Sequence, residues 1–547
     1  MKFMITAVMT VLLGQIFPRV LVQAATPSEK TECSQREMRL ECRNVTSLPP
    51  LEGYETLFVE DSKLARLVKE ELNSTTLKTV TFARNQIEEL GDGAFQFFTN
   101  LASLHLQANV ISSPITWCTF NGLDKLIELR LENQQISMDS FCQCQTTANE
   151  DVPFRSSPCG GLTVLQKLEV LSLNHNPIKS LSDDVFLPLN KSQVRVLNLD
   201  NCELQQIYDG TFAPLGQLNE FTMRNNKGLN MTVVAKISSR LSNLTLAGND
   251  FGTIPKGSFP KLSDLQRLDL SNCNLKSIEN GAFSTLTSLK YMDLSMNKLE
   301  IGSDAIFAGL KTLDSLYLRN NTIRFEGAKS PFKDLNGLKT LDLSGNLITL
   351  LSYNLLMGMD SLQNLLLTGN NIRAWNSAVL GAKASLEILR LGQNDLSEVT
   401  KVMLTDLKKV KKMDLSENKF QCNCQIYDFY GWAAENSGKL ELWQNDTYKC
   451  QGTNDTLHSL RDEGEKLLSH CRGGQGNTDD GGFSTGASSG LGVGIFFLVC
   501  LCVGCCYYKK RRRRRIIATT TVLSPPPASN NININIENSS NAGSGHM

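Results

Sequence analysis

Histidine is scarce in this chain, which has five copies in 547 residues, and none of the five lies in a pattern typical of catalysis. No two of them have the spacing that lets histidines on one helix bind the same metal ion. The sequence also lacks a G-x-S-x-G motif and a glycine-rich phosphate-binding loop. We therefore expect no cofactor and no metal site, and an enzyme is the class of protein that the sequence favours least.

An excess of charge of either sign is lacking too, because 55 lysine and arginine residues balance 55 aspartate and glutamate residues. The net charge near zero is the sum of two different parts of the chain: a long part with a slight acidic excess, and a run of seven basic residues at 509–515. Such a run can bind nucleic acid. Because this run follows an apolar segment, contact with anionic lipid is favoured instead, at about 1 kcal/mol per basic residue. We expect no nucleic-acid partner.

What the chain does contain is a repeat of the form L-x-x-L-x-L-x-x-N-x-L, which is clearest at residues 338–348. Fifteen copies follow one another at a spacing of about 24 residues, and this period is typical of the leucine-rich repeat solenoid. The copies begin at Tyr54, Leu77, Leu101, Leu126, Leu168, Val194, Leu218, Leu241, Leu265, Leu289, Leu313, Leu338, Leu362, Leu386 and Val410. The predicted fold class is an α/β leucine-rich repeat solenoid, a curved parallel β-sheet of about 15 repeats.

Each repeat is expected to supply one short strand whose side chains alternate between the two faces. In the copy around Leu341 and Leu343, both leucines point inward, and Asn346 turns inward to bind backbone groups that the turn leaves unpaired. Cys202 and Cys273 occupy the same inward position in their repeats, where a buried, inert thiol is favoured over a reactive one. Phenylalanine and leucine residues of the return segments are expected to fill the convex half of the core: Phe95, Phe212, Leu215, Phe259, Leu262, Phe283, Leu286, Phe307 and Leu310.

The two ends of the chain predict secretion and membrane anchoring. Lys2 precedes an apolar run at residues 3–13 and a small-residue exit, which indicates a signal peptide over residues 1–24. Residues 491–508 are apolar, and as a helix of 18 residues they would span roughly 27 Å, close to the thickness of a bilayer core. The basic run at 509–515 would remain cytoplasmic. We therefore expect a single-pass type I protein of the plasma membrane.

The expected boundaries follow from these segments. An N-terminal cap at 25–53 precedes the repeats at 54–421, which contain a cysteine-containing insertion at 142–161. A cysteine-rich cap at 422–472 and a Gly/Ser/Asp-rich linker at 473–490 lead to the membrane helix at 491–508 and a short tail at 509–547. In this helix and beside it, a Gly490-x-x-x-Gly494 pattern could bring two copies together, and Cys505 and Cys506 are candidates for palmitoylation.

Cysteines and glycosylation sequons both fit an extracellular compartment. Without Cys202 and Cys273, ten cysteines remain outside the membrane, and we expect them to form disulfides: Cys33, Cys42, Cys118, Cys142, Cys144, Cys159, Cys422, Cys424, Cys450 and Cys471. The pairing of the four around the insertion is open, because four cysteines allow three connectivities. Eight sequons are candidate glycan sites: Asn44, Asn73, Asn190, Asn230, Asn243, Asn320, Asn445 and Asn454.

The spacing Cys422-x-Cys424, Cys450 and Cys471, with the aromatic stretch at 427–432, resembles the C-terminal cap of extracellular leucine-rich repeat proteins. In that family the first cysteine pairs with the third and the second with the fourth, which implies Cys422–Cys450 and Cys424–Cys471. The chain resembles type I leucine-rich repeat membrane proteins, including Toll-like receptor ectodomains and neuronal adhesion proteins. It departs from them in having two cysteines in the N-terminal cap instead of four, and a tail too short for a Toll/interleukin receptor domain or a kinase.

Outward strand positions of the solenoid are where we expect ligand contacts, and larger or charged residues are concentrated there in two groups. The first comprises His105, Gln107, Glu128, Arg130 and Glu132, and the second comprises Tyr291, Tyr317 and Arg319. Both residue types that dominate binding hot spots, Tyr and Arg, are present, although they are also ordinary surface residues. Aspartates recur between the two leucines of the repeat, at positions 269, 293, 342 and 414. They could form an acidic ladder that binds a cation, but we favour the interpretation that Leu-Asp-Leu-Ser is a common form of this repeat.

Two sequons favour the first group as the binding region. Asn243 is an outward strand residue and Asn320 follows a strand, so glycans there would obstruct the middle of the concave face. The cysteine-containing insertion lies beside the first group, and such loops often contact ligands. We expect a cell-surface receptor or adhesion protein that binds an extracellular protein or a microbial or matrix ligand, and that forms homo- or heterodimers. The alternatives are an innate-immune co-receptor or decoy without its own signalling domain, and a structural adhesion organiser.

Overall fold

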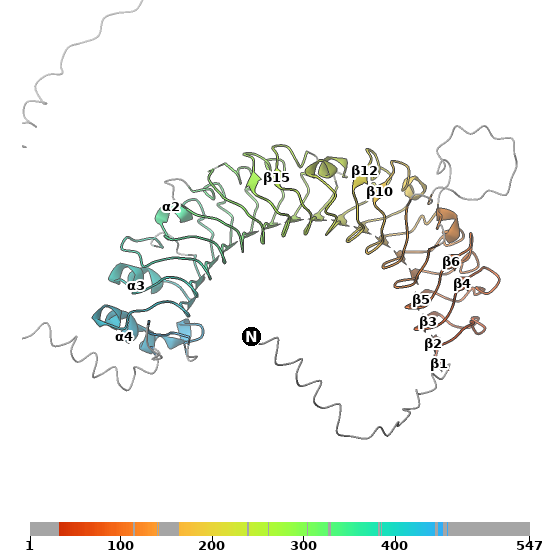
Figure 1. Ribbon diagram of the computed structural model, residues 1–547, viewed down its shortest axis with the longest axis horizontal. Helices are drawn as coiled ribbons and strands as arrows, with labels where there is room; N and C mark the ends of the chain where they lie inside the picture. The colour runs from red at the N-terminus through yellow and green to blue at the C-terminus, as the bar shows by residue number, and fades with distance from the viewer. Residues whose placement is uncertain are drawn as a thin grey trace, which may run out of the picture. The chain divides into compact units, whose positions relative to one another are not determined.

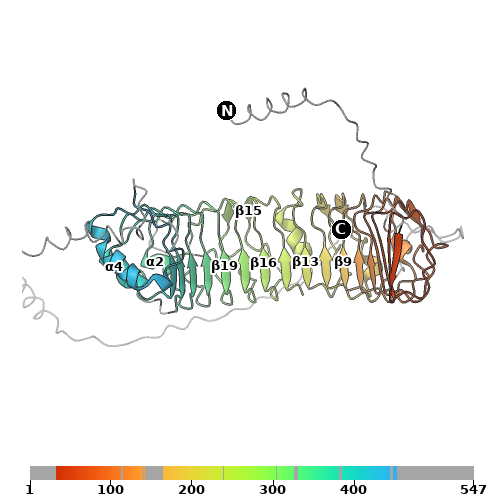
Figure 2. The same cartoon turned by 90° about the horizontal axis from the view of Figure 1, so that it is seen from below.

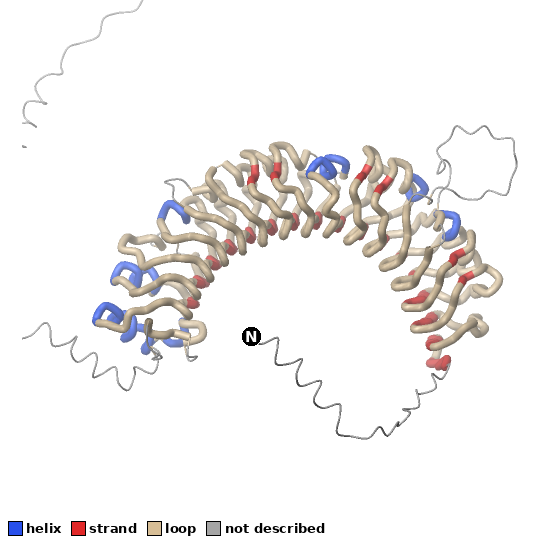
Figure 3. The backbone as a smooth tube through the Cα atoms, in the orientation of Figure 1, coloured by secondary structure: helices blue, strands red, loops and turns tan. Residues whose placement is uncertain are grey.

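The computed structural model describes residues 32–457, apart from 113–114, 139–140, 142–163, 238–239, 261, 304, 326–329, 381–382, 384, 444–446 and 452–456. The repeats form a curved solenoid in which the strands of one long sheet line the concave side and the short helices lie on the convex side (Figures 1 and 3). Seen from the concave side, the strands run side by side along the arc (Figure 2). The expected leucine-rich repeat solenoid is therefore the observed architecture.

The strands of the long sheet are β1 (Glu32–Arg36), β2 (Arg39–Arg43), β3 (Thr56–Glu60), β5 (Thr79–Ala83), β7 (Ser103–His105), β8 (Glu128–Arg130), β9 (Val170–Ser172), β11 (Val196–Asn198), β13 (Glu220–Thr222), β14 (Asn243–Thr245), β16 (Arg267–Asp269), β18 (Tyr291–Asp293), β19 (Ser315–Tyr317), β20 (Thr340–Asp342), β21 (Asn364–Leu366), β22 (Ile388–Arg390) and β23 (Lys412–Asp414). Three two-stranded parallel sheets lie outside it: β4 (Arg66–Leu67) with β6 (Glu89–Leu90), β10 (Ser180–Leu181) with β12 (Gln206–Ile207), and β15 (Thr253–Ile254) with β17 (Ser277–Ile278). The described helices are α2 (Tyr353–Leu356), α3 (Lys401–Leu407) and α4 (Tyr427–Glu435), with 3-10 turns η1 (Trp117–Phe120), η2 (Leu187–Leu189), η3 (Met231–Lys236), η4 (Cys424–Ile426) and η5 (Ser437–Lys439).

Two of the 17 strands, β1 and β2, precede the repeats, and each of the other fifteen belongs to one expected repeat. All neighbouring strands from β2 to β23 pair in parallel, with the leucine of one repeat opposite the leucine of the next, as in Leu341 with Leu365. β1 and β2 form an antiparallel hairpin instead. The 24-residue period therefore places equivalent residues of successive repeats side by side.

The inward asparagines form a hydrogen-bonded row along the solenoid. Asn346 Nδ2 donates to the carbonyl oxygens of Leu318 (3.0 Å) and Leu343 (2.9 Å), while its Oδ1 accepts from the amide of Ile323 (3.1 Å). Its side chain is buried, so these bonds satisfy backbone groups that water cannot reach. The role predicted for Asn346 is confirmed. The preceding residue, Gly345, has a φ of 66°, and a Cβ there would collide with Asn320, which favours glycine in this left-handed turn.

Phenylalanines stack through the convex half of the core, as the return segments predicted. Phe259, Phe283 and Phe307 form a continuous stack with centroid separations of 5.6 and 6.5 Å, which Phe332 extends. The helical content implied by an α/β class is small, however, because most return segments are turns with i→i+3 bonds, such as Leu286 N to Phe283 O. A repeat of about 24 residues leaves too few residues between core positions for a long helix.

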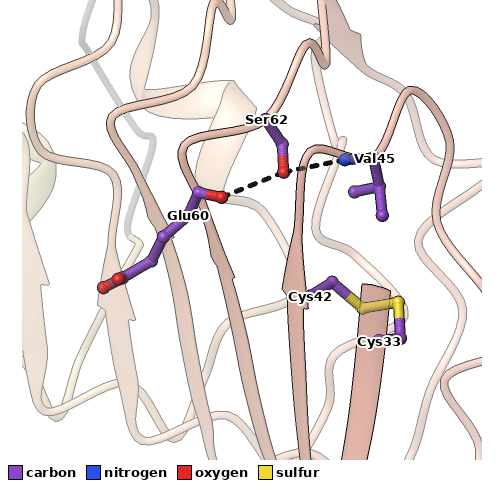
Figure 4. The surroundings of a disulfide bond; sticks show 5 residues. All are labelled: Cys33, Cys42, Val45, Glu60 and Ser62. Carbon is purple, nitrogen blue, oxygen red and sulfur yellow. Dashed lines mark hydrogen bonds between the residues drawn. A yellow bond between two sulfur atoms is a disulfide. The ribbon is translucent and has the colours of Figure 1, made fainter. Parts of the chain in front are cut away.

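Caps cover both ends of the sheet. At the first end, Cys33 and Cys42 are register partners in the β1–β2 hairpin and form a disulfide, and Ser62 donates to Glu60 O and accepts from Val45 N nearby (Figure 4).

At the other end, Cys422 and Cys450 form the disulfide that the family resemblance implied. There, Phe429 of α4 is buried against Phe420 and Trp443, at centroid distances of 5.9 and 6.5 Å. Cys118 and Cys424 are disulfide-bonded as well.

The insertion after the fourth repeat leaves the sheet continuous. β8 and β9, which flank it in the sequence, pair directly, with Glu128 opposite Val170. Buried Trp117 contacts Phe141 edge-on at 5.1 Å, and its Nε1 donates to the carbonyl oxygen of Val185 at 2.7 Å. The solenoid therefore closes across the insertion through contacts between residues on both sides of it.

Several expectations fall outside the described residues. These are the signal peptide, the whole insertion at 142–161, most of the second half of the C-terminal cap, the linker, the membrane helix at 491–508 with Cys505 and Cys506, the tail, and the residues Cys142, Cys144, Cys159, Asn445, Asn454 and Cys471. Within the part of the chain that is described, none of the helices is both long enough and apolar enough to cross a membrane.

Candidate functional site

The first group of predicted binding residues is brought together on two neighbouring strands of the concave face. β7 carries His105 and β8 carries Glu128 and Arg130, and His105 lies opposite Arg130 in the register. Gln107 and Glu132 follow these strands by two residues each. We call these five residues the N-terminal concave cluster.

Hydrogen bonds connect four members of this cluster. Arg130 donates from Nε to Glu128 Oε1 at 2.7 Å and from Nη1 to Glu132 Oε1 at 3.3 Å, so two carboxylates hold one guanidinium. His105 Nε2 lies 3.2 Å from the other oxygen of Glu128. The Arg130 side chain is 43% exposed, whereas that of Glu132 is only 15% exposed. The network thus orients a guanidinium that still reaches solvent.

Electrostatics keeps both ends of the Arg130–Glu128 pair charged. Burial alone would raise the pKa of Glu128, but hydrogen bonds from Arg130 and His105 outweigh burial and lower the pKa below its ordinary value. Burial likewise opposes the charge of Arg130, yet the bonds and charges of Glu128 and Glu132 raise its pKa above the usual value. An ion pair that is partly desolvated and fully charged is a strong, directional feature for recognition.

Gln107 adds an acceptor without a donor. Its Oε1 is buried and has no hydrogen-bond partner among the described residues. A buried polar atom without a partner costs free energy. Because this oxygen does not reach solvent, the groups that the cluster presents to a ligand are the N–H groups of Arg130.

The second predicted group is brought together only in part. Tyr291 of β18 and Tyr317 of β19 lie with ring centroids 5.1 Å apart, and the Tyr291 hydroxyl lies 3.4 Å from Asp293 Oδ2. The guanidinium carbon of Arg267, on β16, lies 3.6 Å from the centroid of the Tyr291 ring. Arg319 has no such contact with either ring. We call Arg267, Tyr291 and Tyr317 the central concave stack.

Arg267 was missed by the sequence analysis, although a signal for it exists. It precedes Tyr291 by one repeat length, in the same outward position, and the two are register partners. Burial raises the pKa of Tyr291 to about 12, and the charge of Asp293 adds to the rise while that of Arg267 opposes it. The phenol therefore stays protonated at physiological pH.

The recurring aspartates have a structural role. Asp269, Asp293, Asp342 and Asp414 each accept from the amide of the residue two positions later, at 2.8–3.0 Å. This local bond satisfies a backbone amide at the end of the strand. It supports the interpretation that the aspartates are a common feature of the repeat and not a cation-binding ladder. In the described ranges, no three His, Cys, Asp or Glu side chains are grouped to hold a metal ion.

Cys202 and Cys273 are free, buried thiols. Each donates to a carbonyl oxygen of the preceding repeat, Leu173 O at 3.3 Å and Leu246 O at 3.2 Å, as the asparagine amides do in other repeats. Burial raises the pKa of each thiol to about 12. The prediction that they are buried structural residues is confirmed.

The sequons lie on different sides of the solenoid. Asn243 is the first residue of β14 on the concave sheet and is half-buried, with Glu220 and Arg267 as register partners. Asn320 is exposed in the turn after β19 and has a φ of 54°. Asn73, Asn190 and Asn230 are exposed, and Asn44 is half-buried in the turn after β2. Asn243 thus lies in the position from which the sequence analysis expected obstruction of the concave face.

Family models for leucine-rich repeats match three stretches of the chain. One described as "Leucine rich repeat" matches residues 239–299 and 328–372, and one described as "BspA type Leucine rich repeat region (6 copies)" matches residues 61–154. The described residues of these stretches belong to the solenoid.

Several known proteins are similar to parts of the chain. Toll-like receptor 3 of Boselaphus tragocamelus is 27% identical over 219 residues, which cover 36% of this chain and 24% of that protein. Keratocan of Gallus gallus is 31% identical over 225 residues (39% and 58%), and leucine-rich repeat transmembrane protein FLRT2 of Rattus norvegicus is 28% identical over 246 residues (42% and 35%). The matched parts therefore span less than two thirds of these relatives.

Among solved structures, the complex of Toll with Spatzle from Drosophila contains a similar fold. The TM-score is 0.54 at 18% sequence identity, and the match covers 75% of this chain and 68% of that chain. At this identity the likeness concerns the fold alone.

Proposed function

Because this chain is a leucine-rich repeat protein similar to extracellular members of that class such as Toll-like receptors, we propose that it is a cell-surface receptor or adhesion protein. Its solenoid would bind an extracellular protein or a microbial or matrix ligand at the N-terminal concave cluster. The proposal is of a binding protein and not of an enzyme. The observation that carries it is the Arg130 guanidinium, which two carboxylates hold in place while it still reaches solvent.

The chemistry of the cluster favours ligand groups that accept hydrogen bonds. Arg130 has N–H donors beyond those that bind Glu128 and Glu132. Backbone carbonyls of a peptide and hydroxyls of a sugar can accept from these donors. Because the carboxylates fix the guanidinium before binding, little side-chain entropy is lost on contact.

Binding to the full-length protein on the cell surface tests this proposal, with a panel of extracellular proteins, microbial products and matrix molecules. Arg130→Glu places a third carboxylate beside Glu128 and Glu132, so we expect it to weaken binding about tenfold or more. Arg319→Glu introduces the same charge change at an exposed arginine of the same face, and it serves as the matched control. Equal effects of the two variants, or a larger effect of Arg319→Glu, would refute the assignment.

The insertion at 142–161 is proposed to add contacts beside this cluster. β8 and β9 pair across it and Trp117 binds Val185, so the repeats are joined without it. Replacing 143–161 by a short Gly/Ser linker should therefore preserve expression and lower ligand affinity. Unchanged affinity would show that the insertion is not part of the binding site. The Arg130→Glu test does not depend on this result.

Membrane anchoring completes the proposal. The signal peptide at 1–24, the apolar segment at 491–508 and the basic run at 509–515 support a single-pass type I arrangement. In that arrangement the basic run at 509–515 would contact anionic lipid, Cys505 and Cys506 would be palmitoylated, and the protein would form homo- or heterodimers. An antibody to the N-terminal cap should label intact cells, and an antibody to the tail should label them only after permeabilisation.

A further inference from the structure

The sequon at Asn243 lies within a strand of the concave sheet, which is an unusual setting because the surroundings of the side chain are fixed by the neighbouring strands. Asn243 and Thr245 are the two outward residues of β14, on either side of buried Leu244. Asn243 is half-buried, and its side chain forms no hydrogen bond with any described residue. Its amide nitrogen is therefore available for a glycan.

The register of the sheet places a particular set of side chains beside Asn243. Arg267 on β16 is its register partner, and Tyr291 on β18 is the partner of Arg267. Neighbouring strands are about 4.8 Å apart, so these three residues form a row across the sheet. Tyr317 on β19 lies opposite Asp293, one outward position beyond this row, and its ring is 5.1 Å from that of Tyr291.

The central concave stack has unused hydrogen-bonding groups. The guanidinium of Arg267 lies over the Tyr291 ring at 3.6 Å, but within the described part of the chain it forms no ion pair and no hydrogen bond. The Tyr317 hydroxyl also has no hydrogen-bond partner among the described residues, and the Tyr291 hydroxyl has only the long contact of 3.4 Å with Asp293. An arginine–tyrosine stack with free donors on Arg267 and Tyr317 thus lies next to the sequon.

The chemistry of this stack suits a sugar. The hydroxyl and acetamide groups of N-acetylglucosamine accept from guanidinium and phenol donors, and its C–H groups can pack on the electron-rich faces of aromatic rings.

From this geometry we infer that Asn243 carries an N-linked glycan whose core lies across Arg267, Tyr291 and Tyr317, so that the chain's own sugar occupies the centre of its concave face. The glycan would be held by the sheet instead of extending into solvent. An external ligand would then find the centre of the sheet already covered. This inference does not depend on which ligand the N-terminal concave cluster binds.

Site-resolved deglycosylation of the native, full-length glycoprotein tests this inference. A peptide-N-glycosidase is added without denaturant, and the conversion of each glycosylated asparagine to aspartate is followed by peptide mass spectrometry. Asn73 is the reference site, because it is exposed and its side chain has no partner among the described residues. We expect release at Asn243 to be about tenfold slower than at Asn73, which corresponds to a contact worth about 1.4 kcal/mol.

Two variants distinguish a glycan that is held by the central concave stack from a glycan that the enzyme reaches slowly because the sheet crowds it. Arg267→Ala and Tyr291→Ala should speed release at Asn243 by about the same factor without changing release at Asn73. Arg319→Ala, at another exposed arginine of the same face, should change neither. Arg267→Ala removes an exposed side chain, so it keeps the test valid even if loss of the half-buried Tyr291 ring impairs secretion. An unmodified Asn243, equal release at the two sites, or slow release that neither variant changes would overturn the inference.

Discussion

The inward position of a repeat accepts either an asparagine or a cysteine because both side chains donate to the equivalent backbone carbonyl of the preceding repeat. Asn226 Nδ2 donates to Leu199 O at 2.9 Å, and Cys202 Sγ donates to Leu173 O at 3.3 Å. A thiol can do so only in its protonated form. The position therefore couples the stability of the repeats to pH when a cysteine occupies it.

This coupling predicts a loss of stability in alkali. Burial raises the pKa of Cys202 and Cys273 from 9.0 to about 12, so the unfolded chain releases these protons first. Their contribution to stability is complete below about pH 9 and is lost as the pH rises towards 12. The double variant Cys202→Asn/Cys273→Asn should show a smaller fall in thermal midpoint between pH 9 and 11 than the wild type, measured by circular dichroism. Parallel curves for the two proteins would contradict the prediction.

At the scale of elements, a buried carboxylate connects α3 to the repeat before it. Asp406 Oδ2 accepts from Trp375 Nε1 at 3.2 Å and from the amides of Val379 and Leu380 at 2.8 and 3.2 Å. The Asp406 side chain is buried, so all three donors depend on this one group. The short helix is thus fixed by a polar contact as well as by its apolar face.

Asp406→Ala should therefore destabilise the last repeats. Leaving buried donors unpaired costs roughly 1–3 kcal/mol for each group, and with partial relaxation we expect a loss of about 3 kcal/mol in the free energy of unfolding, measured with urea. Thr405→Ala in the same helix is the control, because Thr405 is exposed and only binds back to Lys401 O. Its effect should stay within about 0.5 kcal/mol. A similar small effect for Asp406→Ala would show that the contact is dispensable.

For the whole solenoid, stability depends on sealed ends. Every interior repeat is covered by neighbours on both sides, but the last repeat is covered only by the C-terminal cap, through Phe429, Trp443 and Tyr448. The Tyr448 hydroxyl accepts from Leu415 N at 3.1 Å and donates to Glu441 O at 2.8 Å, which attaches the cap to the final strand. Exposed terminal faces of a repeat array lead to aggregation.

Cys450→Ser should therefore reduce the amount of protein that reaches the cell surface, because the Cys422–Cys450 disulfide closes a loop of 28 residues and is worth roughly 3 kcal/mol. Flow cytometry on cells that express the full chain measures this. Cys422→Ser removes the same bond and should behave alike, whereas Cys202→Asn removes a cysteine that forms no disulfide and should not. Normal surface levels of Cys450→Ser would mean that the cap holds without the bond.

Much of this molecule was determined by its sequence. The 24-residue period fixed the parallel register, the inward leucines and the role of Asn346, because equivalent positions of stacked repeats must lie side by side. The same periodicity grouped His105 with Arg130 on neighbouring strands. Residues that act through their position in the repeat can be predicted in this way.

Other features were decided only by the tertiary structure, because they depend on side-chain packing that the period does not specify. The register places Arg267 beside Tyr291, but only the packed side chains show the guanidinium over the ring and leave Arg319 out of the stack. The bond from Trp117 to Val185 spans 68 residues and an insertion, and no spacing in the sequence indicates it.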